Sequence, residues 1–328
     1  MSAVPQCHEV ECADMAQYGA LLKGPWDLDY CQLSAGGLRA HNYGMRLGAS
    51  VAYEESFNRD VSVVGALGRN LVGFSFPYEL AIARGKWWGR AHPGSGVYFA
   101  SGGGEIDVAF PGGYRNILVL VDEDVLRGSY FAHTGEEATF LHPGAFHLSA
   151  APNLTARCRK ALGALIDRKD KRLLHPDSVV MIIVRFLAEA MEVKAGRRTM
   201  ALDPHVRTQI VRKALEIWND SMFEISIAEL SQRVGSSQRT IEHAFRDHFG
   251  HTPHQYLKRC RLGQAREALQ HACPAKASVT EIAMEFGFCE LGRFAGDYRR
   301  FFGELPSQTL ASPSSTSVPL FSARNGLT

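Results

Sequence analysis

Short apolar runs separated by glycine and proline occupy much of the first half of the chain, from about Leu28 to Leu148. Five of these runs are rich in β-branched and aromatic residues, a composition that favours strands. They cover residues 61–67, 71–76, 96–100, 105–110 and 116–121. Short strands at this spacing predict a β-sandwich or a barrel.

The hydrophobic period becomes helical after Pro152. We expect helices from Leu154 to Arg168 and from Asp177 to Val193, because apolar residues recur there on one face. The apolar face of the second helix contains Val180, Ile183, Val184, Leu187 and Met191. This face either packs on the β-rich region or pairs with a second copy of the chain, and the pattern leaves both open.

A polar, glycine-containing segment after Lys194 separates two domains. We place the first domain at residues 1–195, a linker at 196–203 and the second domain at 204–310. The second domain begins with a helix over about Pro204 to Asp220. Residues 311–328 form a tail rich in Ser, Thr and Pro, which buries too little apolar surface to become ordered.

One pattern occurs twice in the second domain. Ser226 to Glu229, followed by Gly235, is matched 52 positions later by Ser278 to Glu281, followed by Gly287. In each copy the Ser and Glu predict an N-terminal capping box, and the Gly predicts the turn that ends the helix. A second helix follows each turn. The sequence therefore predicts two helix-turn-helix units in tandem.

A helix from His254 to His271 joins the two units. Its length of about 18 residues spans roughly 27 Å. Adding the widths of the flanking helices brings the second helices of the two units close to the ~34 Å repeat of B-DNA. Both can then enter successive major grooves on one face of a duplex.

The second helix of the first unit packs through Ile241, Phe245 and Phe249. Its outward side carries Gln238, Arg239, Glu242, His243 and Arg246. Arg239 has the chemistry to bond guanine O6 and N7, and Glu242 can accept from cytosine N4. A charged row of this kind is often only a solvated face, but the tandem repeat favours DNA reading.

The second helix of the second unit packs through Phe294, Tyr298 and Phe302. Its outward set is Leu291, Gly292, Arg293, Gly296, Asp297 and Arg300. Arg293 is the candidate base contact and Arg300 a candidate phosphate contact, so we expect sequence discrimination to rest mainly on the first unit. Further candidate phosphate contacts are Lys258, Arg259, Arg261 and Arg299.

Charge alone would not reveal DNA binding. The 328 residues carry a net charge of +2, and residues 203–311 hold 14 Lys and Arg against 13 Asp and Glu. This balance predicts modest non-specific affinity and binding that weakens as salt rises. Seven scattered cysteines, no apolar run of membrane-spanning length and no signal-like start favour a cytoplasmic protein without a membrane segment.

Catalytic and metal-binding motifs are missing from the sequence. It contains no GxSxG, no P-loop, no CxxC and no Cys/His cluster with zinc spacing. The histidines of the first domain lack the spacing of a metal-binding cupin, and we expect them on the surface or in hydrogen bonds: His41, His92, His133, His142 and His147. We therefore expect no enzyme activity, no metal and no cofactor.

The segment from Glu281 to Leu310 resembles the signature of the AraC/XylS family of transcription regulators, and the similarity covers about Pro204 to Leu310. Its motifs are most similar to those of the branch with benzoate-type and ethanolamine-utilisation regulators. The resemblance implies an α+β protein with a β-rich, cupin-like sensor and dimerisation domain, helices after it, and an all-α domain with two helix-turn-helix units. It implies an activator of transcription that binds double-stranded promoter DNA beside RNA polymerase, responds to a small-molecule effector and can form a homodimer.

Carried over by position, the family's base-contacting places fall on Arg239, Glu242 and His243 in the first unit. In the second unit they fall on Arg293 and Gly296. Gly296 departs from the family pattern, because glycine has no side chain with which to read a base.

Two modes of regulation remain open from the sequence. In the first, a small organic effector binds in the β-rich domain, where aromatic residues either line an apolar pocket or, as is commoner, form core: Phe74, Phe76, Trp87, Trp88, Tyr98 and Phe99. In the second, oxidation of Cys260 on the joining helix or of Cys289 in the second unit changes DNA binding. Dose-dependent DNA binding indicates the first, and loss of oxidant sensitivity after both cysteines are replaced indicates the second.

Overall fold

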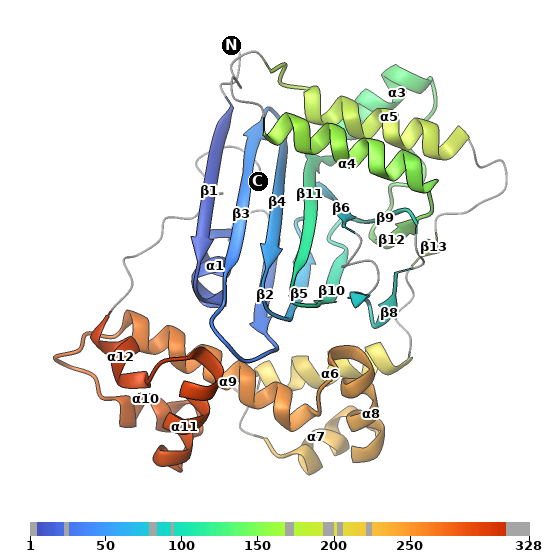
Figure 1. Ribbon diagram of the computed structural model, residues 1–328. Coiled ribbons are helices and arrows are strands. Elements are labelled where there is room, and N and C mark those ends of the chain that lie inside the picture. Colours follow the sequence, from blue (N-terminus) through green and yellow to red (C-terminus); the bar gives the residue numbers. More distant parts are fainter. Residues whose placement is uncertain are drawn as a thin grey trace.

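The computed structural model describes residues 5–22, 26–78, 84–92, 95–167, 174–192, 200–201, 206–220 and 225–312. Most of the predicted linker and residues 313–328 of the predicted tail lie outside this set. Figure 1 shows a β-rich part with three helices on one side, and an all-α part against its opposite side.

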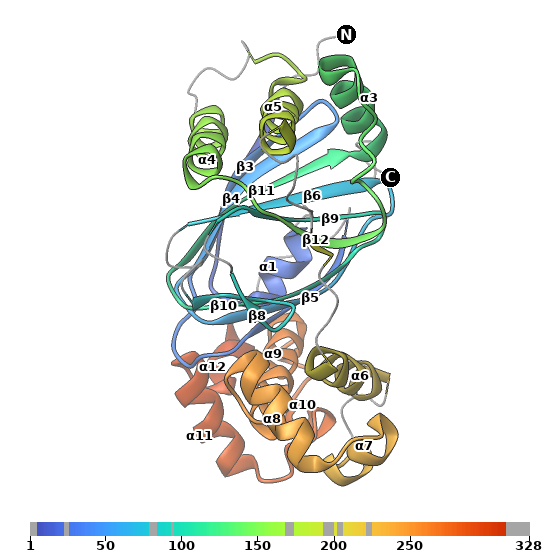
Figure 2. The same cartoon turned by 90° about the vertical axis from the view of Figure 1, so that its right-hand side faces the viewer.

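The β-rich part consists of two antiparallel sheets that face each other, as the strand pattern predicts (Figure 2). The larger sheet has the order β1 (Gln6–Cys12), β3 (Ala40–Leu47), β4 (Ser50–Phe57), β11 (Tyr114–Asp122), β6 (Leu71–Pro77), β9 (Val97–Ser101), β12 (Gly144–Leu148) and β13 (Met200–Ala201). The smaller sheet has the order β2 (Trp26–Gln32), β5 (Val61–Leu67), β10 (Glu105–Phe110), β7 (Lys86–Trp87) and β8 (Arg90–Ala91). The five predicted strands are confirmed as β5, β6, β9, β10 and β11.

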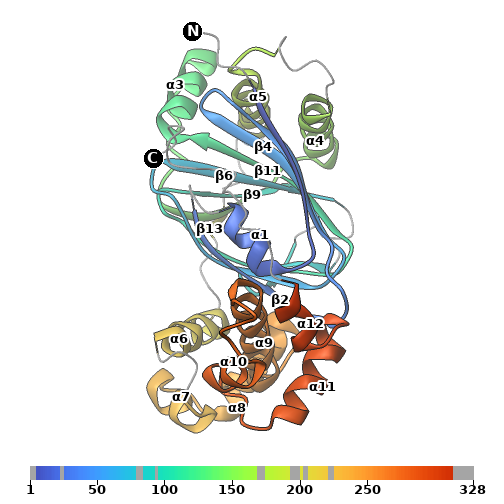
Figure 3. The same cartoon turned by 90° about the vertical axis from the view of Figure 1, so that its left-hand side faces the viewer.

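Helices α3 (Glu123–Thr134), α4 (Pro152–Ile166) and α5 (Ser178–Glu192) cover the outer face of the larger sheet (Figure 2). The two helices predicted after Pro152 are α4 and α5. The apolar face of α5 is buried in the core between these helices and the sheet, so within the chain it packs as a core face. Helix α1 (Met15–Leu22), which the sequence did not reveal, lies between the two sheets (Figure 3).

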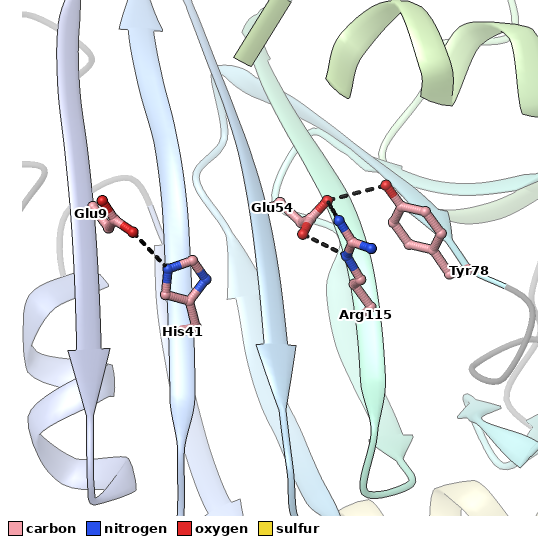
Figure 4. A network of polar contacts seen from close by, with 5 residues as sticks. All are labelled: Glu9, His41, Glu54, Tyr78 and Arg115. Carbon is pink, nitrogen blue, oxygen red and sulfur yellow. Dashed lines mark hydrogen bonds and ion pairs between the residues drawn. The ribbon is translucent and has the colours of Figure 1, made fainter. Parts of the chain in front are cut away.

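Alternation along each strand separates two cores. On β4, Ala52 belongs to the core under the helices, whereas Tyr53 and Phe57 belong to the core between the sheets. Glu54 therefore points to the outer face, where its carboxylate accepts hydrogen bonds from Arg115 at 2.6 and 2.9 Å (Figure 4). Glu55, the next residue, points into the space between the sheets and is buried.

The all-α part contains α6 (Val206–Asp220), α7 (Ile227–Val234), α8 (Gln238–Phe249), α9 (Pro253–His271), α10 (Val279–Glu285), α11 (Leu291–Phe302) and α12 (Pro306–Ala311). Both predicted helix-turn-helix units are present, as α7–α8 and α10–α11. Gly235 and Gly287 both have φ of 76°, a backbone conformation in which glycine is unstrained. The joining helix is α9, one residue longer than expected at its start.

The two predicted capping boxes differ in the structure. Ser278 and Glu281 form both hydrogen bonds of the box. Ser226 accepts from the backbone N–H of Glu229, but the Glu229 carboxylate turns to Arg233 one helical turn on. The first box is therefore half formed, because a nearby guanidinium competes with the backbone N–H for the carboxylate.

The smaller sheet lies between the inter-sheet core and the all-α part. Its outer face contributes Leu33, Val64 and Ala109 to the apolar core that α6, α7, α8 and the start of α9 share. A second core, between the later part of α9 and α10 to α12, is separate. The first helix-turn-helix unit therefore folds directly on the β-rich domain.

Candidate DNA-binding surface

Helix α8 exposes the side chains that the sequence assigned to it. Ser237 caps its start by accepting from the Thr240 N–H at 3.1 Å, and Ile241, Ala244, Phe245 and Phe249 are buried. Gln238, Arg239, His243 and Arg246 are exposed, and Glu242 is half-exposed. Glu242 and Arg246 form an exposed ion pair at 3.4 Å, which DNA phosphates or bases can open at small cost.

Helix α11 shows the same two-sided arrangement with one change in the packing set. Phe294, Tyr298 and Phe301 are buried, whereas the predicted packing residue Phe302 is only half-buried. Arg293 and Arg300 are exposed, and Gly296 is also on the exposed side. The outward set of α11 therefore offers the guanidinium groups of Arg293 and Arg300.

Asp297 does not belong to the outward set. Its side chain is 11% exposed, and its carboxylate lies 2.5 Å from Lys258 Nζ on α9 and 3.0 Å from Arg300. The reason is helical geometry: position 297 shares a face with Phe294, Tyr298 and Phe301, which packs on the rest of the unit. Asp297 positions two cations. Its predicted outward orientation is wrong, and a contact with DNA stays a prediction.

The four further candidate phosphate contacts differ in how accessible their side chains are. Lys258 is held by Asp297, and Arg259 is half-buried at the domain interface, where burial lowers the pKa of its guanidinium. Arg261 is half-buried beside Gly287. Arg299, on α11, is exposed. Of these four residues, Arg299 is the most available to a phosphate.

The C-terminal ends of α8 and α11 both contact the β-rich domain. His248 on α8 lies 2.6 Å from Asp107 on β10, and both side chains are at most 2% exposed. The carbonyl of Phe301 on α11 accepts a hydrogen bond from the backbone N–H of Gly36 at 2.7 Å. Figure 1 shows α8 and α11 toward opposite ends of α9, with their other ends away from the sheets.

Further polar contacts cross the same boundary. Thr208 on α6 donates to the carbonyl of Trp88 at 3.0 Å, and Lys86 donates to the carbonyl of Asp247 at 2.6 Å. Gln270 near the end of α9 donates to Asp14 at 2.8 Å. The thiols of Cys31 on β2 and Cys260 on α9 lie 3.2 Å apart. The two domains are thus joined at several points, through α6, α8 and two positions of α9.

Sequence reasoning missed the interface pair of Asp107 and His248. Asp107 is a charge within an otherwise apolar strand, and His248 is a polar residue on the packing side of a helix. Each is a visible departure from its pattern. Only the tertiary structure shows that the two departures satisfy each other, because their partners are 141 positions apart.

Among the described residues, no helix is both long and apolar enough to cross a bilayer. The same residues bring together no group of three or more His, Cys, Asp or Glu with metal-binding geometry.

Comparison with known proteins concerns mainly the second domain. A family model described as "Helix-turn-helix domain" matches residues 230–312. Over 86 residues the chain is 42% identical to the probable thc operon regulatory protein of Rhodococcus erythropolis, and this aligned region covers 26% of each protein. Over 86 residues it is also 42% identical to the XylDLEGF operon transcriptional activator of Pseudomonas putida, covering 26% of this chain and 27% of that protein.

The matched region spans about a quarter of the length of these relatives. The crystal structure of a probable AraC family transcriptional regulator from Rhodopseudomonas palustris is 39% identical, over 32% of this chain and 98% of that chain, with a TM-score of 0.29. The tandem helix-turn-helix units, with the family match over residues 230–312 and the 42% identity to the two regulators named above, are those of the AraC/XylS family of helix-turn-helix transcription regulators, related to the XylS-type activators.

Proposed function

We propose that the protein is a sequence-specific DNA-binding activator of transcription whose β-rich domain holds a small organic effector. The observation that carries the proposal is the pair of helices α8 and α11, each with its N-terminal part exposed and its C-terminal end held by the β-rich domain. The relatives named as an operon regulator and a transcriptional activator support this direction. RNA polymerase is the partner expected of an activator.

On this proposal the first unit reads most of the sequence. Arg239, Glu242 and His243 lie on the free side of α8 and meet base edges, with Gln238 at the helix start and Arg246 one turn further along. In the second unit Arg293 meets a base, Arg300 meets phosphate, and Gly296 allows close approach without reading. Asp297 acts behind Arg300 by orienting its guanidinium.

The smaller sheet offers a short path from an effector to α8. On β10, Ile106 and Val108 line the cavity between the sheets, while Asp107 pairs with His248 and Ala109 joins the helical core. Successive residues of one strand thus contact an effector site and a DNA-reading helix on opposite faces. A compound that displaces β10 changes the support of α8, which couples effector and DNA binding.

The turn between β7 and β8 strengthens this link. Trp88 lines the cavity, and its carbonyl accepts from Thr208 on α6. Its φ of 50° is the one positive value of a non-glycine residue among those the structure describes, so the surrounding contacts hold it in a strained conformation. Release of this strain by a ligand favours a second arrangement of the interface.

The proposal is tested by footprinting the full-length protein on the DNA upstream of its own gene, at fixed salt. Each subunit is expected to protect two adjacent major grooves, and an effector is expected to shift the affinity in a dose-dependent manner. Absence of protection with and without candidate effectors would contradict DNA-binding regulation. A homodimer is a separate expectation, to be measured by sedimentation in the same buffer.

A second candidate function, thiol sensing, is favoured by the distance of 3.2 Å between the Cys31 and Cys260 sulfur atoms. Both residues line a cleft between the domains that a small oxidant can enter. One hydrogen peroxide oxidises the two thiols to one disulfide and yields two waters. The hydrogen bond with Cys260 and burial raise the pKa of Cys31, so it remains a thiol at neutral pH and reacts slowly.

Peroxide should then change DNA binding by the parent protein and leave Cys31→Ser unaffected. Cys289 is exposed in the second unit, so Cys289→Ser is the matched control and should retain the response. Equal sensitivity of the parent and Cys31→Ser would rule out this pair, and a response lost only in Cys289→Ser would assign the sensing to Cys289.

A further inference from the structure

The cavity between the two sheets has an unusual lining for an effector site. Its volume is about 80 Å³, several times what one water requires. Aromatic rings on its wall include Tyr30, Tyr53, Trp87, Trp88 and Tyr98. Of the described residues that line it, none is Lys, Arg or His, and Glu55 is the one that carries an ionisable carboxyl group.

Five of the six expected pocket residues border the cavity, and Phe76 does not. Trp87, Trp88 and Tyr98 belong to the core around the cavity, whereas the side chains of Phe74, Phe76 and Phe99 belong to the core under the helices. Strand alternation causes the division: Tyr98 and Phe99 are neighbours on β9 and point to opposite faces. The described wall of the cavity therefore combines five Tyr and Trp rings, which have apolar faces and polar edges, with Phe and aliphatic side chains.

Glu55 is fixed by neutral partners. Its carboxylate accepts from the Tyr18 hydroxyl at 3.0 Å and from the Tyr114 hydroxyl at 3.4 Å. In the sheet register it lies between Asn42 on β3 and Asn116 on β11. The chain of hydrogen bonds continues from Tyr18 to Asn42 at 3.0 Å and on to His8 at 2.7 Å, so this histidine reaches Glu55 through two other side chains.

No cation among the described residues pairs with Glu55, in contrast to its neighbour. Glu54, one position earlier, has the Arg115 guanidinium on the outer face of the sheet (Figure 4). A buried carboxylate without a cation is costly, because its charge has lost water and gained no opposite charge. A site that retains such a group has a ready place for a positive charge brought by a ligand.

We propose that the effector is a small aromatic or alicyclic amine, bound as its ammonium ion to Glu55 with its apolar body against the Tyr and Trp rings. The inference rests on the proposed function only in calling this ligand the effector. The rings attract a cation through their faces, and the apolar wall removes the ligand's hydrocarbon from water. A carboxylate ligand is disfavoured on charge while Glu55 is ionised, because it would face a like charge in a site of low dielectric without a compensating cation.

Burial raises the pKa of Glu55 to about 7, while the hydrogen bonds from Tyr18, Tyr114 and Asn116 act in the opposite direction. Tyr30 and Tyr53 are the other titratable groups that interact with it, and their pKa values are raised, so they stay neutral. An ammonium ion binds best to the ionised carboxylate. Amine affinity is therefore expected to rise as pH increases from about 6 to 8.

The test uses the full-length protein and three probes that differ in charge: benzylamine, benzyl alcohol and benzoate. Binding is followed by calorimetry and by the fluorescence of Trp87 and Trp88. Benzylamine should bind at least tenfold more tightly than benzoate at pH 8. Glu55→Gln, which keeps the size and one acceptor, should lower benzylamine affinity at least tenfold, and the matched outer-face variant Glu54→Gln should leave it unchanged.

Several results would overturn the proposal: benzoate binding as tightly as benzylamine, unchanged benzylamine affinity in Glu55→Gln, pH-independent benzylamine affinity in the parent, or no saturable binding of any probe. The pH series on the parent keeps the test decisive if the variant folds poorly. Footprinting in parallel separates the two proposals. Benzylamine binding with unaltered DNA affinity supports the site and contradicts gating, whereas absent DNA binding contradicts only the function.

Discussion

Arg239 lies at the free end of α8, exposed and without an ion pair among the described residues, whereas Arg246 on the same face pairs with Glu242. An unpaired, exposed guanidinium can meet a base without first breaking a protein contact. Asp297 shows the opposite case, since it pairs with Lys258 on α9 and with Arg300 on its own helix. At the scale of single residues, the pairing of each side chain decides which charges are available to DNA.

Arg239→Ala should weaken binding to the specific site by about 1–3 kcal/mol and relax the preference at one base position, because one bidentate base contact is lost. The measurement is a titration of the operator and of single-base variants. Arg299→Ala is the control. It should lower the affinity for all DNA sequences equally and reduce the slope of log affinity against log salt by about 1. Unchanged operator affinity in Arg239→Ala would show that α8 enters the groove by a different face.

The buried pair of Asp107 and His248 should respond to removal of its charge. Asp107→Asn keeps the shape and replaces a charged acceptor, so the free energy of unfolding should fall by roughly 1–3 kcal/mol. Hydrogen exchange should accelerate in β10 and in the last turn of α8. An unfolding midpoint equal to that of the parent would mean that the pair does not hold the domains together.

The turn of the β7–β8 hairpin is the element that most closely joins the cavity to the helices. Trp88 and Gly89 have φ of 50° and 70°, the combination expected of a two-residue type I′ turn. A Cβ on Gly89 would lie 2.7 Å from Thr208 Oγ1 and 2.9 Å from His248 Nδ1. The hairpin therefore reaches α6 and α8 only because this position has no side chain.

Gly89→Ala should push α6 and α8 away from the sheet and weaken the effect of an effector on DNA binding. Gly135→Ala is the matched control, since Gly135 has φ of 76° at the end of α3 and nothing lies within 4 Å of its added Cβ. Both variants carry the left-handed strain of about 1–2 kcal/mol. Faster proteolysis or exchange at the domain boundary in Gly89→Ala alone is expected, and equal behaviour of the two would refute the steric argument.

The whole molecule is layered: helices, the larger sheet, the smaller sheet and the DNA-binding domain follow one another (Figure 2). The proposed effector site and the first helix-turn-helix unit occupy opposite faces of the smaller sheet. The fold therefore makes the stability of the β-rich domain and the position of α8 depend on the same three strands, β2, β5 and β10.

Stability should depend on pH through Glu55. The pKa of this carboxyl is about 7 in the folded protein against 4.5 for an ordinary carboxyl, so the folded state retains the proton longer. The free energy of unfolding therefore falls as the pH rises from about 4.5 to 7, by at most roughly 3 kcal/mol. Glu55→Gln should be more stable than the parent at pH 8 and nearly equal at pH 4.5. Parallel stability curves of the two proteins in denaturant titrations would contradict the burial effect.

Much of the architecture follows from the sequence alone. Periodicity located five strands, the helices α4 and α5 and the tandem units, because apolar spacing and capping residues act locally. The outward residues of α8 were predicted for the same reason. The start of the chain was missed, since β1 is largely polar and α1 spans only eight residues.

The sequence by itself determined that two helix-turn-helix units follow a β-rich domain, because repeats, caps and hydrophobic periods are written within a few residues of each other. Tertiary structure alone decided which charges remain free for DNA, that Asp107 meets His248 and Cys31 meets Cys260, and that no cation among the described residues pairs with Glu55. Those facts depend on partners tens to hundreds of positions away, and local sequence carries no information about which distant side chain shares a buried space.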